Sequence, residues 1–145
     1  MIVLLCGPPG VGKTTLATRV VDRLRARGAT IGLLHSDDFA SRTYERMYER
    51  VEHEGEDWLL DGTFYRREWR ERFRGLDEVC IVHVTASLES CLERNRRRSD
   101  PISETGVHVV YREFEAPRAE LTIDTDELSE EEAVDRLYEA IEERR

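Results

Sequence analysis

The chain has 145 residues, 37% of them charged, and a formal net charge of −9 at pH 7. This length predicts one domain, residues 1–145, that is large enough for a buried core. The acidic balance argues against a surface that coats nucleic acid, although it is compatible with local basic patches. No stretch approaches membrane-spanning length. Three cysteines without metal-ligand spacing predict buried thiols in a reducing, cytoplasmic compartment: Cys6, Cys80 and Cys91.

The first predicted elements surround a glycine-rich loop. Residues 1–6 (MIVLLC) form an apolar run that predicts a buried strand. Residues 7–14 (GPPGVGKT) match G-x-x-x-x-G-K-[ST], the loop that holds nucleotide phosphates. Apolar residues then recur at helical spacing from Leu16 to Leu24, and Gly28 ends the predicted helix. Strand, glycine loop and helix therefore follow one another in the order that phosphate binding requires.

The residue types in this loop suit a phosphate chain. Gly7 and Gly12 are expected to take left-handed conformations, so that successive N–H groups point into one concavity. Lys13 can reach the β- and γ-phosphates, and the Thr14 hydroxyl can coordinate Mg²⁺. Lys13 is the only lysine in a chain with 22 Lys and Arg residues, which favours function over a plain turn between core elements. We predict that a nucleoside triphosphate, taken as ATP, binds with Mg²⁺ at Gly7, Pro8, Pro9, Gly10, Val11, Gly12, Lys13, Thr14 and Thr15.

Short apolar runs downstream predict four further strands, at residues 29–35, 58–60, 79–84 and 121–123. Helix signals lie between and after them: Ser36-Asp37-Asp38 at one helix start, Gly75 at one helix end, Ser87 as a cap, and Ser129 with Glu132 as a capping box. Residues 107–114 fit a helix, although their alternation also fits a strand. This order predicts an α/β fold. We expect a P-loop NTPase-type, doubly wound parallel five-stranded sheet, ordered 2-3-1-4-5, with helices on both faces and a short lid.

Acidic residues follow two of the predicted strands, at the edge where parallel sheets bind ligands. Asp61 ends an apolar run, as expected of the acid that supports Mg²⁺ beside the phosphate loop. An ordinary Asp-Gly turn is the alternative. Asp37 and Asp38 follow the second strand, where a carboxylate can accept a proton from an attacking hydroxyl. The alternative there is a stabilised helix N-terminus.

One group of arginines predicts a lid. Arg94 and residues 96–98 (RRR) precede a polar break, Ser99-Asp100-Pro101. Arginines on a closing segment can stabilise the charge that develops during phosphoryl transfer. We expect the lid at about residues 94–110, with Arg94 and Arg98 as catalytic candidates. A solvated cationic helix end is the alternative.

A second group of arginines follows Asp61, on the side where an acceptor is expected to bind. Arginine forks suit phosphate, sulfate or carboxylate groups. Glu68 and Glu71 make plain ion pairs on a helix surface an equal alternative. With the two acids after the second strand, the predicted acceptor residues are Asp37, Asp38, Arg42, Tyr65, Arg66 and Arg70.

The order of these motifs resembles the small P-loop kinases. The segments that carry the resemblance are GPPGVGKTT, HSDDF, LLDGTFYRREWRERF, CLERNRRR, YREFEAP and LTIDTDELS, and they extend over nearly the whole chain. The similar groups are adenylylsulfate kinases, polynucleotide kinases and the kinase of seryl-tRNA. The resemblance implies that Asp37 is the general base and that Thr125 and Asp126 lie near adenine. The chain lacks the acid, glycine, acid and asparagine pattern of adenylylsulfate kinases and the substrate domain of the tRNA kinase, so the acceptor is left open.

These observations predict a kinase that transfers the γ-phosphoryl group of ATP, with Mg²⁺, to a hydroxyl of a small nucleotide-like acceptor. A polynucleotide or RNA 5′-hydroxyl is the alternative acceptor. An ATP-binding switch or partner-binding module with slow ATPase activity is the alternative from another class, although a switch needs neither the acid pair nor the lid arginines. We expect a monomer or homodimer with no membrane association.

Overall fold

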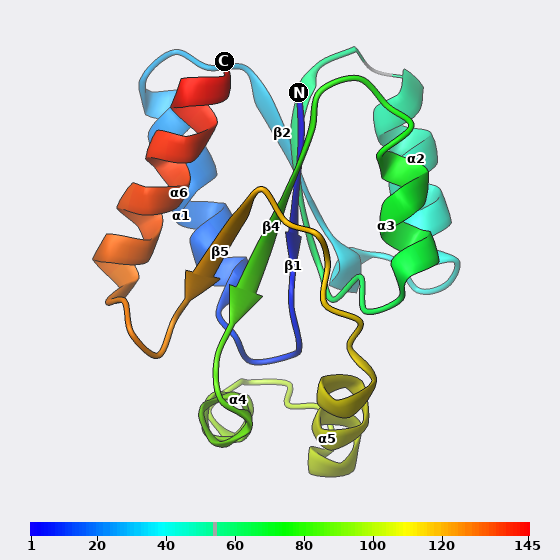
Figure 1. Ribbon diagram of the computed structural model, residues 1–145, viewed down its shortest axis with the longest axis vertical. Helices are drawn as coiled ribbons and strands as arrows, with labels where there is room; N and C mark the ends of the chain where they lie inside the picture. Colours follow the sequence, from blue (N-terminus) through cyan, green and yellow to red (C-terminus); the bar gives the residue numbers. More distant parts are fainter. Residues whose placement is uncertain (54) are drawn as a thin grey trace.

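The computed structural model describes residues 1–53 and 55–145 and contains a five-stranded parallel sheet (Figure 1). The strand order is β2-β3-β1-β4-β5, and every recorded pairing between neighbours is parallel. This confirms the predicted sheet and its order. The strands are β1 (Ile2–Cys6), β2 (Ile31–His35), β3 (Asp57–Gly62), β4 (Val79–Thr85) and β5 (Leu121–Asp124).

Helices cover both faces of the sheet, as predicted. One face carries α1 (Lys13–Ala26) and α6 (Glu130–Arg144), and the other carries α2 (Thr43–His53) and α3 (Arg67–Phe73) (Figure 1). Alternate residues of the central strand β1 therefore face two different cores. Val3 and Leu5 pack with α1 and α6, whereas Ile2, Leu4 and Cys6 pack with α2 and α3. Burial on both sides explains why the strand is continuously apolar.

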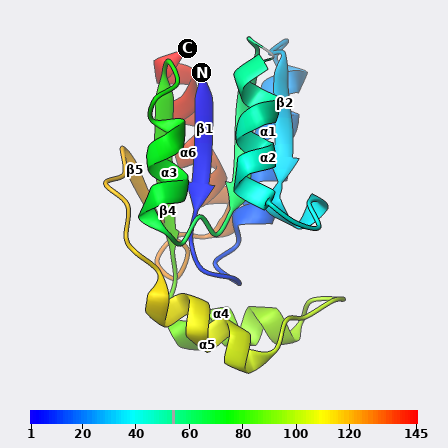
Figure 2. The same cartoon turned by 90° about the vertical axis from the view of Figure 1, so that its right-hand side faces the viewer.

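Two more helices form a hairpin beyond the carboxyl ends of the strands. They are α4 (Leu88–Arg96) and α5 (Glu104–Glu113), and they form a separate layer below the strand ends (Figures 1 and 2). Ser87 caps α4 and Ser103 caps α5 by accepting backbone N–H bonds. The helical interpretation of residues 107–114 therefore agrees with the structure, apart from Phe114, which follows the last helical residue.

The segment after β2 differs from the prediction. Ser36–Asp38 form a single 3₁₀ turn, and α2 begins only at Thr43. The preceding residue, Arg42, has a φ of 51°, a left-handed conformation that an α-helix cannot contain. The acids therefore lie on a turn at the sheet edge and not on a helix N-terminus.

The three cysteines are buried and free, as predicted from their apolar surroundings. Within the described part of the chain, no helix combines the length and the apolar character needed to cross a membrane.

Candidate active site

The glycine-rich loop connects β1 to α1 and uses its glycines in two ways. Gly10 and Gly12 have φ values of 88° and 98°, in the left-handed region where glycine is favoured. Gly7, which we expected to be left-handed, does not have a positive φ. It is needed for close approach instead, because a Cβ atom there would lie 2.3 Å from the Val84 carbonyl oxygen of β4. The left-handed pair is therefore Gly10 and Gly12.

Lys13 lies folded into this loop. Its Nζ donates hydrogen bonds to the carbonyl oxygens of Gly7 at 2.7 Å and Pro8 at 2.9 Å, and the residue is only 7% exposed. Burial lowers the pKa of Lys13, and the nearby Asp61 carboxylate opposes that shift. The ammonium group is thus held over the concavity of the loop.

Asp61 joins three elements at the strand ends. It lies in β3 between Leu5 of β1 and His35 of β2, and it is 3% exposed. Its Oδ2 accepts a hydrogen bond from the Thr14 hydroxyl at 2.8 Å and lies 2.8 Å from Nδ1 of His35. The bond to Asp61 raises the pKa of His35. Hydroxyl and carboxylate oxygens are the ligand types that Mg²⁺ binds, so this pair fits a metal beside the loop.

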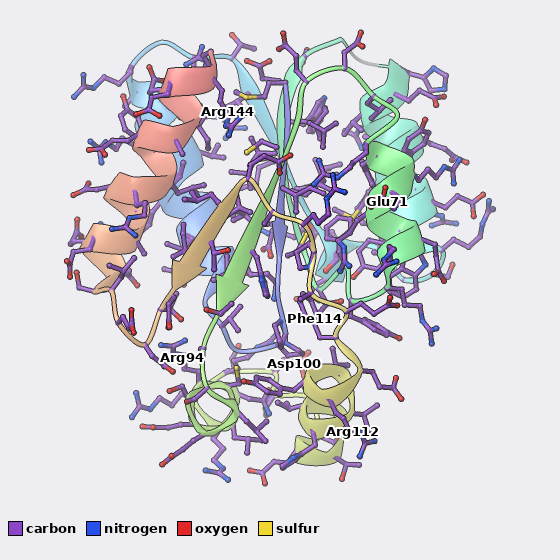
Figure 3. All side chains as sticks on the ribbon, viewed as in Figure 1. Glu71, Arg94, Asp100, Arg112, Phe114 and Arg144 are labelled. Atoms are coloured by element: carbon purple, nitrogen blue, oxygen red, sulfur yellow. The ribbon has the colours of Figure 1, made fainter. Side chains whose placement is uncertain are left out.

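Arg94 and Thr125 meet at the outer side of the loop. Arg94 Nη1 donates to the Gly10 carbonyl at 3.2 Å and to the Thr125 hydroxyl oxygen at 2.9 Å. The Thr125 hydroxyl lies 2.9 Å from the Val11 carbonyl, to which it can donate. Both residues border a cavity of about 180 Å³ between the loop and the start of α6. Arg94 is marked in Figure 3 at the top of α4, just below β4.

A larger cavity, the phosphate-loop cavity, has a volume of about 640 Å³. Asp37 and Arg98 lie on its wall from opposite elements, with Arg98 Nη2 and Asp37 Oδ2 3.6 Å apart. Asp38 is exposed and is not among its lining residues. The cavity is lined by Pro9, Gly10, Gly12, Lys13, Thr14, Thr15, His35, Ser36, Asp37, Asp61, Thr63, Arg94, Arg98, Ile102 and Val110.

The other predicted acceptor residues do not line this cavity. Arg42 pairs with Glu45 at the surface, and Tyr65 packs edge-on against Trp69, with Arg66 over both rings. Arg70 is 2% exposed and donates to the Phe64 carbonyl at 2.6 Å.

The physical reason lies in the turn after β3. Phe64 has a φ of 43°, and α3 then packs beside α2. Arg67 and Arg70 of α3 line a different cavity, and Arg70 is held by the Phe64 carbonyl.

Five lining residues are not among the predicted site residues: His35, Ser36, Thr63, Ile102 and Val110. His35 could have been found, because it is the last residue of the second strand and parallel strands end at one edge. Ile102 and Val110 lie within the predicted lid, but only the folding of the α4–α5 hairpin shows that they line the cavity.

A family model described as "AAA domain" matches residues 2–123. The chain belongs to this AAA domain family. None of the curated proteins matches the sequence. The fold of this AAA domain is shared with several solved structures, each below 25% identity.

A sugar kinase from Janibacter sp. HTCC2649 has a TM-score of 0.79 at 17% identity, with 97% of this chain and 94% of that chain covered. Kti12 from Chaetomium thermophilum, in complex with ADP-AlF3, has a TM-score of 0.76 at 18% identity, covering 97% and 99%. The APS kinase CysC from Mycobacterium tuberculosis, in complex with AMPPNP and APS, has a TM-score of 0.73 at 18% identity, covering 97% and 96%. These similarities confirm the predicted relation to the small P-loop kinases at the level of the fold.

Proposed function

We propose that this AAA domain is a Mg²⁺-dependent kinase that transfers the γ-phosphoryl group of ATP to a hydroxyl of a small, nucleotide-like acceptor. The observation that carries the proposal is the position of Asp37. It lies on the wall of the same cavity as the phosphate loop, the Thr14–Asp61 pair and the arginines of α4. A nucleotide switch needs no carboxylate at that position.

The loop residues would hold the triphosphate. The loop and the start of α1 line the cavity, where their backbone N–H groups would bind phosphate oxygens, and Lys13 supplies a positive charge. Thr14 and Asp61 would hold Mg²⁺, directly or through water, with phosphate oxygens completing its shell. The metal, when bound, neutralises charge on the phosphates. Arg94 and Thr125, beside the 180 Å³ cavity, would lie near the nucleoside.

Asp37 would act as the general base. Its carboxylate takes the proton of the acceptor hydroxyl while the hydroxyl oxygen attacks the γ-phosphorus and ADP leaves. Arg98, 3.6 Å from the Asp37 carboxylate, is placed to stabilise the charge that develops on the transferred group.

The α4–α5 hairpin would act as the lid. Arg94, Arg98, Ile102 and Val110 all reach the cavity from this hairpin. With the hairpin in this position the cavity of about 640 Å³ must accommodate phosphates and acceptor together, which favours a small acceptor over a polynucleotide. The similarity to an APS kinase whose structure holds AMPPNP and APS supports the same choice.

A panel of hydroxyl compounds incubated with γ-labelled ATP and Mg²⁺ tests the proposal. It should contain adenylylsulfate, simple nucleosides, sugars and an RNA with a free 5′-hydroxyl. We expect label transfer to a small nucleotide-like compound. Transfer only to RNA would replace the proposed acceptor with the alternative one. Phosphate release at the same rate with and without every acceptor would instead indicate a switch and contradict the proposal.

A further inference from the structure

A third cavity, which we call the arginine-lined cavity, lies beside α3. It has a volume of about 480 Å³ and shares no lining residue with the phosphate-loop cavity. Its lining residues come from α3, from β4 and from the segment 114–120. This segment runs from α5 back to β5 (Figures 1 and 2). Glu71 on α3 and Phe114 at the start of this segment are marked in Figure 3. Its lining residues are Arg67, Arg70, Glu71, Arg74, Ile81, Ala116, Pro117 and Arg118.

Both ends of the segment 114–120 are held in place by hydrogen bonds to other parts of the fold. At one end the Glu115 N–H donates to the Tyr65 carbonyl at 2.9 Å. At the other end Glu120 accepts from Arg74 at 2.7 Å and from the Ile81 N–H at 2.8 Å. Arg74 also donates to the Arg118 carbonyl. The residues between these anchors form one wall of the cavity, so the cavity is part of the fold.

Arg70 is the innermost charged group of this cavity. It is 2% exposed, and its one recorded hydrogen bond goes from Nη1 to the Phe64 carbonyl. Among the residues that the structure describes, none forms an ion pair with it. A carbonyl satisfies a single donor, and the guanidinium carbon lies 5.8 Å from the centroid of the Phe114 ring. Glu115 and Glu71 favour the charged form without forming an ion pair with it, so the buried charge has no direct counter-charge, which is costly. Burial accordingly lowers the pKa of Arg70.

The remaining charges of the cavity are also predominantly positive. Arg74 is neutralised by Glu120. The side chains of Arg67 and Arg118 are exposed and form no ion pair with any residue in the described ranges. Glu71 lies on the wall and Glu115 lies nearby, accepting from the Arg67 N–H at 3.4 Å. Three arginines without carboxylate partners thus surround one hollow in a protein of net charge −9.

We propose that the arginine-lined cavity binds the phosphate group of a small phosphorylated molecule, at a site separate from the phosphate-loop cavity. Arginine forks match phosphate oxygens, and Arg70 in the interior with Arg67 and Arg118 at the rim can approach one phosphate together. Glu71 is the one acidic side chain on the wall, and it suits a hydroxyl of the molecule that carries the phosphate. This inference does not depend on the proposed kinase activity.

Nuclear magnetic resonance can distinguish binding at the arginine-lined cavity from binding at the phosphate loop in one titration. The full-length protein, labelled with ¹⁵N, is titrated first with inorganic phosphate and then with glycerol 3-phosphate. Signals of Glu71, Ala116 and Arg118 report on the arginine-lined cavity, and those of Gly12 and Thr15 report on the phosphate loop. We expect saturable shifts at the first set, with tighter binding of the monoester because it also offers hydroxyls to Glu71.

Two surface variants provide the decisive comparison. The double variant Arg67→Gln/Arg118→Gln should weaken phosphate binding at the first set of signals by about tenfold or more, because charge-assisted hydrogen bonds are lost. It should leave the phosphate-loop signals unchanged. Arg112→Gln, an exposed arginine on α5, changes charge elsewhere and should change neither set. Absent or non-saturable shifts at Glu71, Ala116 and Arg118, or an equal effect of the double variant and Arg112→Gln, would overturn the proposal.

Discussion

The phosphate-loop cavity and the arginine-lined cavity both concentrate positive charge, but they are built from different parts of the chain. The first is lined mainly by one short stretch of the chain, Pro9, Gly10 and residues 12–15, together with residues at the neighbouring strand ends and on the α4–α5 hairpin. The second combines one face of α3 with a segment about 45 residues later in the sequence. A site made by consecutive residues can be predicted from the sequence. A site made by two distant segments cannot be predicted in this way, because it depends on which side chains each segment turns toward the other.

The two cavities also differ in the partners of their cationic side chains. Around the phosphate loop, Lys13 and Arg94 donate to backbone carbonyls of the loop itself, and Asp61 lies close enough to oppose the loss of charge on Lys13. In the arginine-lined cavity, Arg70 donates to one carbonyl and forms no ion pair with any of the described residues, although Glu115 and Glu71 lie near enough to favour its charge. Lys13 thus lies near a carboxylate of its own site, whereas Arg70 forms no ion pair within the described residues. The following variants test whether the two cavities act as separate sites and which residues of the phosphate-loop cavity carry its function.

The largest effect is expected from Lys13→Ala. The ammonium group makes charge-assisted bonds worth about 1.5–3 kcal/mol each, so affinity for ATP–Mg²⁺ should fall about a hundredfold or more and transfer should be lost. Calorimetric titration with circular dichroism as a check on folding measures this. Phosphate binding at the arginine-lined cavity should be unaffected, and a parallel loss there would break the distinction between the two sites.

The second variant pair separates a base from a neighbouring acid. Asp37→Asn cannot accept a proton, so turnover should fall by about 10²- to 10⁴-fold while ATP affinity changes little. Asp38→Asn is the matched control, because Asp38 lies on the same turn but does not line the cavity. Steady-state kinetics on both variants measures the difference. Equal activity of the two would remove Asp37 from the proposed mechanism.

Asp61→Asn should change the response to Mg²⁺ more than the response to ATP. The substitution removes the charge beside Thr14 but keeps an oxygen that can accept the hydroxyl hydrogen bond. We expect the Mg²⁺ concentration for half-maximal turnover to rise about tenfold and activity to recover partly at high metal. A titration with Mg²⁺ at saturating ATP tests this. An unchanged metal requirement would assign Asp61 a purely structural role.

The smallest effect is expected in the α4–α5 hairpin. Buried Asn95 closes it with two hydrogen bonds to Ile102, at 2.8 and 3.1 Å. Asn95→Ala should lower the free energy of unfolding by about 1–3 kcal/mol and speed hydrogen exchange in residues 97–103. Arg97→Gln removes only an exposed pair with Glu93 and should cost at most about 0.5 kcal/mol. Equal exchange rates in both variants would show that Asn95 does not hold the hairpin.

The consecutive residues of this sequence determined a large part of the fold. The apolar runs, the glycine-rich loop and the caps at Ser87 and Ser129 act within a few residues of themselves, so the strands and most helices were predicted correctly. The strand order was also predicted correctly, but as part of the fold that the phosphate loop and the alternation of strands and helices indicate. The loop–helix start at Lys13 and the strand end at Asp61 were also legible, because parallel strands bring their carboxyl ends to one edge.

Only the tertiary structure decided which side chains share a cavity. Gly7 needs to be glycine because of Val84, a residue of another strand, and not because of its own φ. The turn at Phe64 directs α3 away from the phosphate loop, so Arg70 and Arg67 face the segment 114–120. The direction in which a helix presents its side chains depends on long-range packing. A left-handed residue or a buried hydrogen bond can change that direction, and no local pattern in the sequence indicates it. The sequence therefore predicted the acidic residues at the strand ends, but it could not predict which cavity the arginines of α3 would line.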